Sequence, residues 1–270
     1  MLKDILVYLD DREHSDALQA ALHMAERHSA HLSGLYVTSL FQYVAAKDVT
    51  MAGLWDACMD ELRSAPARAQ RRYDAAIGRP GVRNDWRHVQ GDPATRLSHY
   101  GRAVDLIVLG QPMEDAPPIL RDVADKVLLA AGRPVLIVPT TGFSGSLGKR
   151  VLVAWDGSRE AARAVSDAVP LLAGAKQVIV MAVDPSAEEN EIPCAEIALH
   201  LARHGMEVEA VRATASDSQV GQVLLEQAGR RAVDLIVIGA YGHSRLAEIM
   251  LGGVTRYMLK HTKVPILMSH

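Results

Sequence analysis

The sequence predicts an α/β protein made of two tandem domains, each with a five-stranded parallel sheet of the plan βαβαβαβαβ. The first observation is an internal repeat, because the segment AVDLIV occurs at residues 103–108 and again at 232–237. The second is the alternation of short apolar runs, rich in β-branched residues, with amphipathic stretches of helical length. Continuous apolar strands separated by helices are typical of a parallel sheet covered on both faces.

The repeat extends over both halves of the 270-residue chain. Ile5–Val7 matches Val151–Val153 at an offset of 146, and Arg133–Ile137 resembles Val264–Met268. The offset falls to 129 at the AVDLIV segment, so the first half carries 17 more residues before that strand. Each copy spans about 130 residues, an ordinary domain size. We therefore expect a domain at 1–140, a linker rich in glycine and serine at 141–148, and a second domain at 149–270.

The elements of the second copy follow from local patterns. Val151–Ala154 is a continuous apolar strand, and Ser158 after it is a good helix cap. Apolar residues then recur at helical spacing up to residue 172, and Gly205 is a typical stop for a later helix. The other expected elements are strands at 178–183, 208–211, 235–238 and 266–268, and helices at 197–204, 220–228 and 254–261.

The first copy follows the same order, with its fifth strand at 135–138. Its 17 extra residues fall within 41–77 and predict a longer second helix around residues 54–73. In both copies the plan is the open, twisted α/β sheet in which the position of a ligand follows from the strand order.

Composition excludes several classes of protein. Apolar residues make up 49% of the chain and charged residues 23%, as in a typical globular protein, and the net charge of −3 lacks the basic character of a nucleic-acid binder. No apolar run is long enough to span a membrane. The two cysteines, Cys58 and Cys194, are too few for a disulfide scaffold. We expect a cytoplasmic protein without a nucleic-acid or membrane partner.

Ligands of open α/β sheets bind beyond the carboxyl ends of the strands, here between the first and fourth strands of a copy. In the second copy Asp156 follows the first strand, Gly239 and Gly242 follow the fourth, and His243 and Arg245 add hydrogen-bond donors. Glycines let the backbone approach a ligand, and the free N–H groups that begin the last helix favour an anion. Asp156 can accept from a base or a ribose. A plain tight loop is the alternative interpretation of these glycines.

The spacing G-x2-G-x9-G followed by a small residue, in Gly239, Gly242, Gly252 and Gly253, resembles the nucleotide-binding loop of the universal stress protein family. Residues 250–261 and 264–268 look like that family's last helix and last strand. The resemblance covers both copies and implies a tandem universal stress protein with the Rossmann-like, adenine nucleotide alpha hydrolase-like fold. It also implies that the second domain binds ATP or a related adenine nucleotide, with Mg²⁺ as a candidate companion.

The resemblance implies roles for single residues. Asp156 and Val183 flank the adenine, and Gly239 and Gly242 border the ribose and the phosphates. The start of the last helix offers backbone N–H groups, and Thr255 offers a hydroxyl. Gly253 departs from the family pattern, which usually has Ser or Thr there, so a hydroxyl donor is lost while the backbone donor remains. The expected binding set is Ala154, Trp155, Asp156, Val183, Gly239, Gly242, His243, Arg245, Gly252, Gly253, Val254 and Thr255.

The first copy departs from this pattern. After Gly110 it continues with an acidic, proline-rich segment at 111–118, and Arg121 and Asp122 stand where Gly252 and Gly253 would be. Carboxylates oppose the binding of phosphates, and prolines remove backbone donors. We expect that the first copy does not bind ATP in the family manner.

Other chemistries have weaker support. His200 and His204 lie four apart with Cys194 upstream, but no second cysteine and no HExxH pattern accompany them, so we expect no metal site. Asp10 and Asp11 resemble the acidic pair of a receiver domain, whose lysine after the fifth strand is missing here. The GxSxG, Walker A and GxGxxG patterns are absent, so no catalytic residues are expected.

Three functions stay open. The leading one is a stress-response module in which a nucleotide in the second copy biases the protein's conformation or partners. The alternatives are a slow ATPase or phosphotransfer enzyme, and a structural dimerisation module without nucleotide. In the family the last strands of two domains commonly pair. The resemblance therefore implies antiparallel pairing of 135–138 with 266–268 within one chain, and a homodimer of chains as a further step.

Overall fold

A computed structural model describes most of the chain, and its residue contacts divide it into two units, Leu2–Phe143 and Ser144–His270. The described residues are 1–12, 15–39, 52–78, 81–113, 116, 118–183, 194–242 and 253–270.

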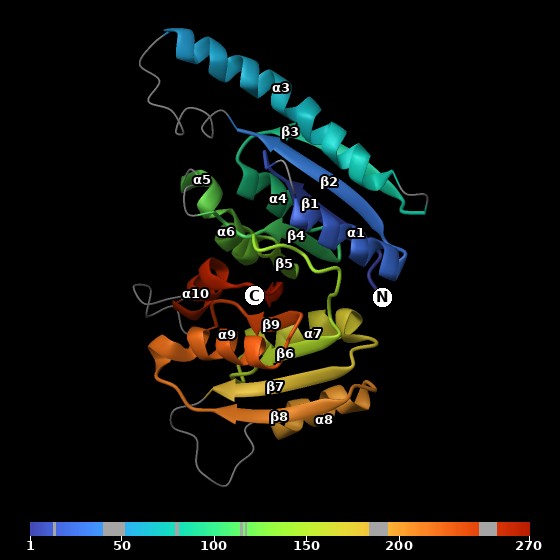
Figure 1. Ribbon diagram of the computed structural model, residues 1–270, viewed down its shortest axis with the longest axis vertical. Helices are drawn as coiled ribbons and strands as arrows, with labels where there is room; N and C mark the ends of the chain where they lie inside the picture. Colours follow the sequence, from blue (N-terminus) through green and yellow to red (C-terminus); the bar gives the residue numbers. More distant parts are fainter. Residues whose placement is uncertain are drawn as a thin grey trace. The chain divides into compact units, whose positions relative to one another are not determined.

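The first unit is a parallel sheet in the order β3-β2-β1-β4-β5. Helices α1 and α3 pack together, as do α4 and α6, so both faces of the sheet are covered (Figure 1). Its strands are β1 (Asp4–Leu9), β2 (His31–Thr38), β3 (Asn84–Gln90), β4 (Leu106–Gly110) and β5 (Val135–Val138). Its helices are α1 (Asp16–His28), α3 (Ala52–Ile77), α4 (Pro93–Gly101), α5 (Pro118–Arg121) and α6 (Val123–Ala130).

The second unit repeats the same topology, with the parallel order β8-β7-β6-β9-β10. Helix α7 packs on β9 and β10, while α9 and α10 pack on each other. The strands are β6 (Arg150–Ala154), β7 (Gln177–Val183), β8 (Val208–Ala213), β9 (Leu235–Gly239) and β10 (Ile266–Ser269). The helices are α7 (Arg159–Leu172), α8 (Ala195–Arg203), the short 3-10 turn η1 (Asp217–Gln219), α9 (Val220–Arg230) and α10 (Gly253–His261).

The fold class predicted from the sequence is confirmed in both units. In each sheet the first strand lies beside the fourth. The strand order therefore reverses between these two strands, as predicted from the sequence. Ser158 caps α7 as expected, because its hydroxyl oxygen accepts from the N–H of Ala161 at 3.1 Å. The long second helix of the first copy also exists, but α3 is longer than the predicted 54–73.

The repeated aspartate of AVDLIV has a structural role in both copies. Asp105 accepts at Oδ2 from the backbone N–H groups of Lys3 and Asp4, at 2.6 and 3.1 Å. Asp234 accepts at Oδ1 from the N–H groups of Lys149 and Arg150, at 2.9 and 3.0 Å. Each carboxylate therefore joins the start of the fourth strand to the start of the first. It thus fixes the two strands between which the strand order reverses, which is the switch point of the sheet.

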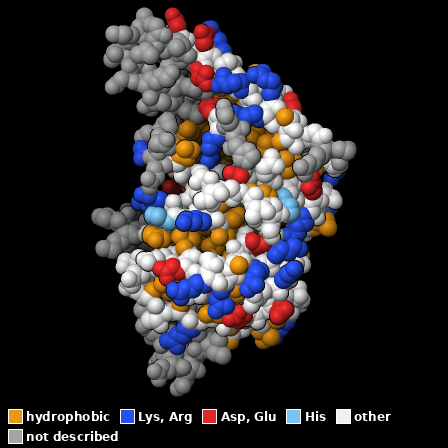
Figure 2. All heavy atoms as spheres, viewed as in Figure 1, with side chains coloured by type: hydrophobic (Ala, Val, Ile, Leu, Met, Phe, Trp, Pro, Cys, Tyr) orange, Lys and Arg blue, Asp and Glu red, His pale blue; other side chains and the backbone are white. Residues whose placement is uncertain are grey.

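The surface carries both signs of charge. On the face shown in Figure 2, blue basic and red acidic side chains are interspersed, with apolar side chains among them. Within the part of the chain that the structure describes, no helix is both long and apolar enough to cross a membrane. The predicted pairing of the two fifth strands concerns the placement of one unit against the other and stays a prediction.

Candidate functional site

The carboxyl ends of β6 and β9 lie next to each other in the second unit. Val151 pairs with Leu235, and Val153 pairs with Val237. The chain beyond Ala154 continues the sheet for one more residue, because the N–H of Trp155 donates to the oxygen of Met181 at 2.9 Å. Asp156, Gly239 and the last residue of β7, Val183, therefore lie at one edge of the sheet, as the sequence predicts for three members of the expected set.

Asp156 begins a tight turn that leads into α7. Its Oδ1 accepts from both the N–H and the hydroxyl of Ser158, at 2.9 and 2.6 Å. Gly157, between them, has φ of +74°, a left-handed conformation that favours glycine. The turn thus orients the Asp156 carboxylate at the edge of the sheet while Ser158 caps the helix.

The two glycines of the loop after β9 face the start of α7. A Cβ on Gly239 would lie 2.5 Å from the nitrogen of Ala161, so glycine is needed there for the close packing of α7 on β9. A Cβ on Gly242 would lie 3.1 Å from Oε2 of Glu160 and 3.2 Å from Oγ of Ser158. Gly239 therefore has a packing role. From the sequence alone, this role could not be distinguished from a role in ligand binding.

The first turn of α10 meets the same loop. The hydroxyl oxygen of Thr255, whose side chain is only 4% exposed, accepts from the N–H of Tyr241 at 3.4 Å. Tyr241 itself has φ of +60°, an uncommon left-handed conformation for a residue with a side chain. Val254 is half-buried, whereas Gly253 is exposed and a Cβ there would meet no described residue within 4 Å. His243, Arg245 and Gly252 lie outside the described residues.

Two residues of this edge were missed by sequence reasoning. Glu160, in the first turn of α7, is only 5% exposed and accepts from Nε of Arg159 at 2.8 Å. Burial raises the pKa of this carboxyl, but hydrogen bonds from Arg159 and from its own backbone N–H outweigh that effect and leave the pKa below its ordinary value. His270 donates from Nδ1 to the oxygen of Ala240 at 2.9 Å. For Glu160, the only signal in the sequence was that an acidic residue stands in the first turn of a predicted helix.

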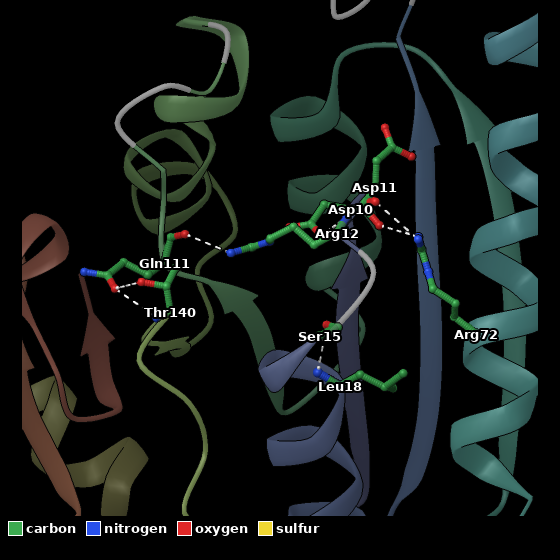
Figure 3. A network of polar contacts seen from close by, with 8 residues as sticks. All are labelled: Asp10, Asp11, Arg12, Ser15, Leu18, Arg72, Gln111 and Thr140. Carbon is green, nitrogen blue, oxygen red and sulfur yellow. Dashed lines mark hydrogen bonds and ion pairs between the residues drawn. The ribbon is translucent and has the colours of Figure 1, made fainter.

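The first copy has a different arrangement at the equivalent edge (Figure 3). Nε of Arg12 donates to Oδ2 of Asp10 at 2.6 Å, and Nη1 lies 3.4 Å from the oxygen of Gln111. Whereas Gly239 faces the backbone of α7, Gly110 faces the Arg12 guanidinium, which fills the space of a Cβ. The side chain of Arg12 therefore covers the first glycine of the loop after β4.

Comparison with known proteins identifies the family of both copies. A model of the universal stress protein family matches residues 1–139 and again 148–270. The chain belongs to the universal stress protein family. The two matches agree with the tandem organisation inferred from the internal repeat, and the family accounts for the shared strand order of the two sheets.

Individual universal stress proteins are similar to this chain over different lengths. Universal stress protein Slr1230 of Synechocystis is 26% identical over 176 residues, which cover 60% of this chain and 57% of that protein. The chain thus matches little more than half the length of that relative. A universal stress protein from Archaeoglobus fulgidus has a TM-score of 0.73 at 18% identity, covering 98% of this chain and 95% of its own. A protein of unknown function from Pseudomonas aeruginosa has a TM-score of 0.63 at 19% identity, covering 99% and 92%.

The two solved structures share the universal stress protein fold with this chain at low sequence identity. A common fold does not fix what a site binds, because the chemistry depends on the residues at the carboxyl ends of the strands. In this chain those residues differ between the copies. In the second copy no described residue approaches a Cβ at Gly253 within 4 Å, and the first copy has the Arg12–Asp10 pair.

Proposed function

We propose that the second universal stress domain binds ATP, or a related adenine nucleotide, at the carboxyl ends of β6 and β9. The protein would then act in the cytoplasm as a nucleotide-dependent regulatory module of the stress response. One observation carries the proposal: the hydrogen bond from the N–H of Tyr241 to Oγ1 of Thr255 holds the glycine loop against the first turn of α10. The segment after β9 and the first turn of α10 therefore lie at one place.

The start of α10 is suited to phosphate groups for a physical reason. The first four N–H groups of an α-helix have no acceptor within the helix, and the helix dipole favours negative charge there. Gly253, the first residue of α10, leaves that position open to a ligand. The Gly253 backbone would thus donate to a phosphate without a side chain in the way, although it lacks the hydroxyl usual in the family.

The acidic side chains at the same edge favour a divalent cation with the nucleotide. Asp156 and Glu160 both lie in the segment between β6 and the first turn of α7. Two carboxylates near a triphosphate oppose its binding by charge repulsion. We therefore infer that ATP binds together with Mg²⁺, which would neutralise part of the phosphate charge.

We further infer that the first copy does not hold ATP. The Arg12 guanidinium, paired with Asp10, lies against Gly110, so a charged side-chain pair occupies the carboxyl ends of β1 and β4. The segment after β4 also contributes Pro112, which has no N–H to donate. The internal pairing of the fifth strands and the homodimer remain part of this proposal.

A charge at the helix start tests the site. Gly253→Asp introduces a carboxylate where a Cβ meets open space, so the fold should tolerate it and the helix dipole should even stabilise it. We expect the variant to keep the melting temperature of the parent without ligand and to lose the increase that ATP and Mg²⁺ cause. The matched control is Gly229→Asp, also in open space, on α9. A Gly253→Asp variant that is stabilised by ATP as strongly as the parent contradicts the proposed site.

A further inference from the structure

Strand β3 lies at the outer end of the first sheet, and β2 is its one neighbour among the strands that the structure describes. None of the seven residues of β3 is buried, whereas all residues of β5, at the other end of the strand order of this unit, are buried. An exposed edge strand presents backbone donors and acceptors to which another strand can add. The free side of β3 is therefore a candidate interaction surface.

Alternate residues of β3 point their backbone groups away from β2. The oxygen of Arg83 accepts from the N–H of Leu32 at 2.9 Å, and the N–H of Gly91 donates to the oxygen of Thr38 at 3.0 Å. Because backbone groups alternate in direction along a strand, the odd-numbered residues of β3 bond to β2. The even-numbered residues from 84 to 88 therefore direct their N–H and C=O groups to the free side.

Two opposite charges stand on one face of this edge. Nε of Arg87 donates to Oδ2 of Asp85 at 2.7 Å, so the two side chains are paired within the strand. The guanidinium also lies 5.5 Å from the centre of the Tyr100 ring, on α4. The Arg87 side chain is 50% exposed, and its guanidinium has five N–H donors. Arg87 can therefore reach a second carboxylate beside the edge and keep its bond to Asp85.

One antiparallel register of β3 against the β3 of a second copy suits these charges. With Trp86 opposite Trp86, each Asp85 lies opposite an Arg87, and the outward backbone groups of the two strands meet. A slip by two residues places Asp85 opposite Asp85 in one direction and Arg87 opposite Arg87 in the other. Like charges directly opposite each other destabilise a strand pair, so the sequence of β3 favours the register centred on Trp86.

We propose that β3 is a docking edge for a second copy of this chain, in an antiparallel pair centred on Trp86. The backbone groups of the two edges bond to each other, and the cross-strand Asp85–Arg87 pairs join the pairs within each strand into a ring of alternating charges. On the other face the two Trp86 side chains are opposite each other, and aromatic cross-strand pairs stabilise sheets. This surface specifies the homodimer named under the proposed function and does not depend on nucleotide binding.

Two charge reversals test the register. Arg87→Asp makes the edge wholly negative and Asp85→Arg makes it wholly positive, so each variant should repel its own copy, whereas a mixture of the two should pair. The intact chains are compared by analytical ultracentrifugation at low salt and at up to about 1 mM chain, because a single strand pair is a small interface. We expect the parent to form dimers, each variant alone to dimerise at least about tenfold more weakly, and the equimolar mixture to recover dimers.

The outcomes separate this surface from the homodimer as such. A parent that stays monomeric overturns the proposal and the homodimer together. A folded Arg87→Asp variant that dimerises as strongly as the parent overturns this surface alone. A mixture of the two folded variants that fails to recover dimers overturns the register.

Matched proline variants test the edge itself, and they replace Asp85→Arg should its melting curve show that it does not fold. Asn84→Pro removes an outward N–H, which an edge strand tolerates, and should weaken the dimer at least about tenfold. The control is Ala210→Pro on β8, at the outer end of the second sheet, where the oxygen of Glu207 accepts from the N–H of Val178 and even-numbered residues again point outward. It should leave dimerisation unchanged. A folded Asn84→Pro variant that dimerises like the parent overturns the proposal.

Discussion

At the residue scale, glycines at the same place in the two sheets have different neighbours. Gly239 faces the backbone of α7, and Gly110 faces the guanidinium of Arg12. The first neighbour cannot move without shifting a helix, whereas the second is the end of a flexible side chain. The same residue type in the same topological position therefore allows close helix packing in one copy and contact with a charged side chain in the other.

Replacing Gly239 by alanine should destabilise the second unit. The added Cβ would lie 2.5 Å from the nitrogen of Ala161, so α7 must move, and overpacking of this kind costs about 1–3 kcal/mol. The control is Gly229→Ala, where a Cβ meets nothing within 4 Å and a helical glycine is replaced; there we expect a gain of about 0.5–1 kcal/mol. Denaturant unfolding measures both, and equal effects of the two substitutions contradict the packing role.

His28 should make stability depend on pH. It is buried at the end of α1, where Nδ1 accepts from the N–H of Leu2 at 3.4 Å, and Nε2 has no hydrogen-bond partner among the described residues. Burial, with the nearby Arg27 adding to it, lowers the pKa of His28 from 6.5 to about 4. The fold therefore favours neutral His28, and its contribution to stability is present above pH 6.5 and is lost as the pH falls towards 4.

The expected loss from His28 is up to about 3 kcal/mol between pH 6.5 and pH 4. Urea unfolding across this range measures it. His28→Leu removes the titrating group and should flatten the profile by that amount, although it also removes the acceptor for Leu2. An unchanged slope in the variant would show that other groups cause the acid sensitivity.

At the scale of elements, the position of the switch point depends on how the fourth strand is anchored to the first. The aspartate of AVDLIV provides this anchor in both copies, through Asp105 and Asp234. The backbone completes it, because the N–H of Asp105 donates to the oxygen of Asp4 and the N–H of Asp234 to that of Arg150, each at 2.9 Å. An identical hexapeptide in two otherwise divergent copies thus anchors the same two strands through backbone N–H groups at the start of the first strand.

Removal of this anchor should lower stability. Asp234→Ala leaves the N–H groups of Lys149 and Arg150 without their carboxylate acceptor and removes a partner of the Ser146 hydroxyl. Hydrogen bonds to charged groups contribute about 1.5–3 kcal/mol in proteins, so we expect a loss within that range. The control is Asp167→Ala, which breaks the Arg163 pair on the surface of α7 and should cost less than about 1 kcal/mol. Thermal denaturation compares them, and similar melting temperatures contradict the anchoring role.

The long helix α3 shows what local patterns miss at this scale. The sequence places a helix at 54–73, and the structure extends it to Ala52–Ile77, past Tyr73. The hydroxyl of Tyr73 donates to the oxygens of Leu32 and Asp85, at 2.9 Å each, and its ring lies over Gly34. These contacts join α3 to β2 and β3 across the sheet. Helical periodicity contains no information about such long-range partners, so it predicts the helix but not its ends.

At the scale of the whole molecule, the sequence predicts architecture better than site chemistry. The internal repeat and the apolar strands were sufficient to predict two parallel sheets with the same order, because strand burial and the repeat are visible locally. The sequence also predicts that Asp156, Val183 and Gly239 share one edge. It could not reveal Glu160, whose side chain approaches Gly242 only through the packing of α7 on β9. The Arg12 side chain over Gly110 was missed for the same reason.

The central claim is that the two copies have divided their roles, with nucleotide binding confined to the second. The Tyr241–Thr255 contact and the open start of α10 support it on one side, and the Arg12–Asp10 pair over Gly110 supports it on the other. Calorimetric titration of the intact chain with ATP and Mg²⁺ tests the claim most directly. The account predicts one site per chain, abolished by Gly253→Asp and unchanged by Asp122→Ala. Two equal sites per chain, or no binding at all, would contradict it.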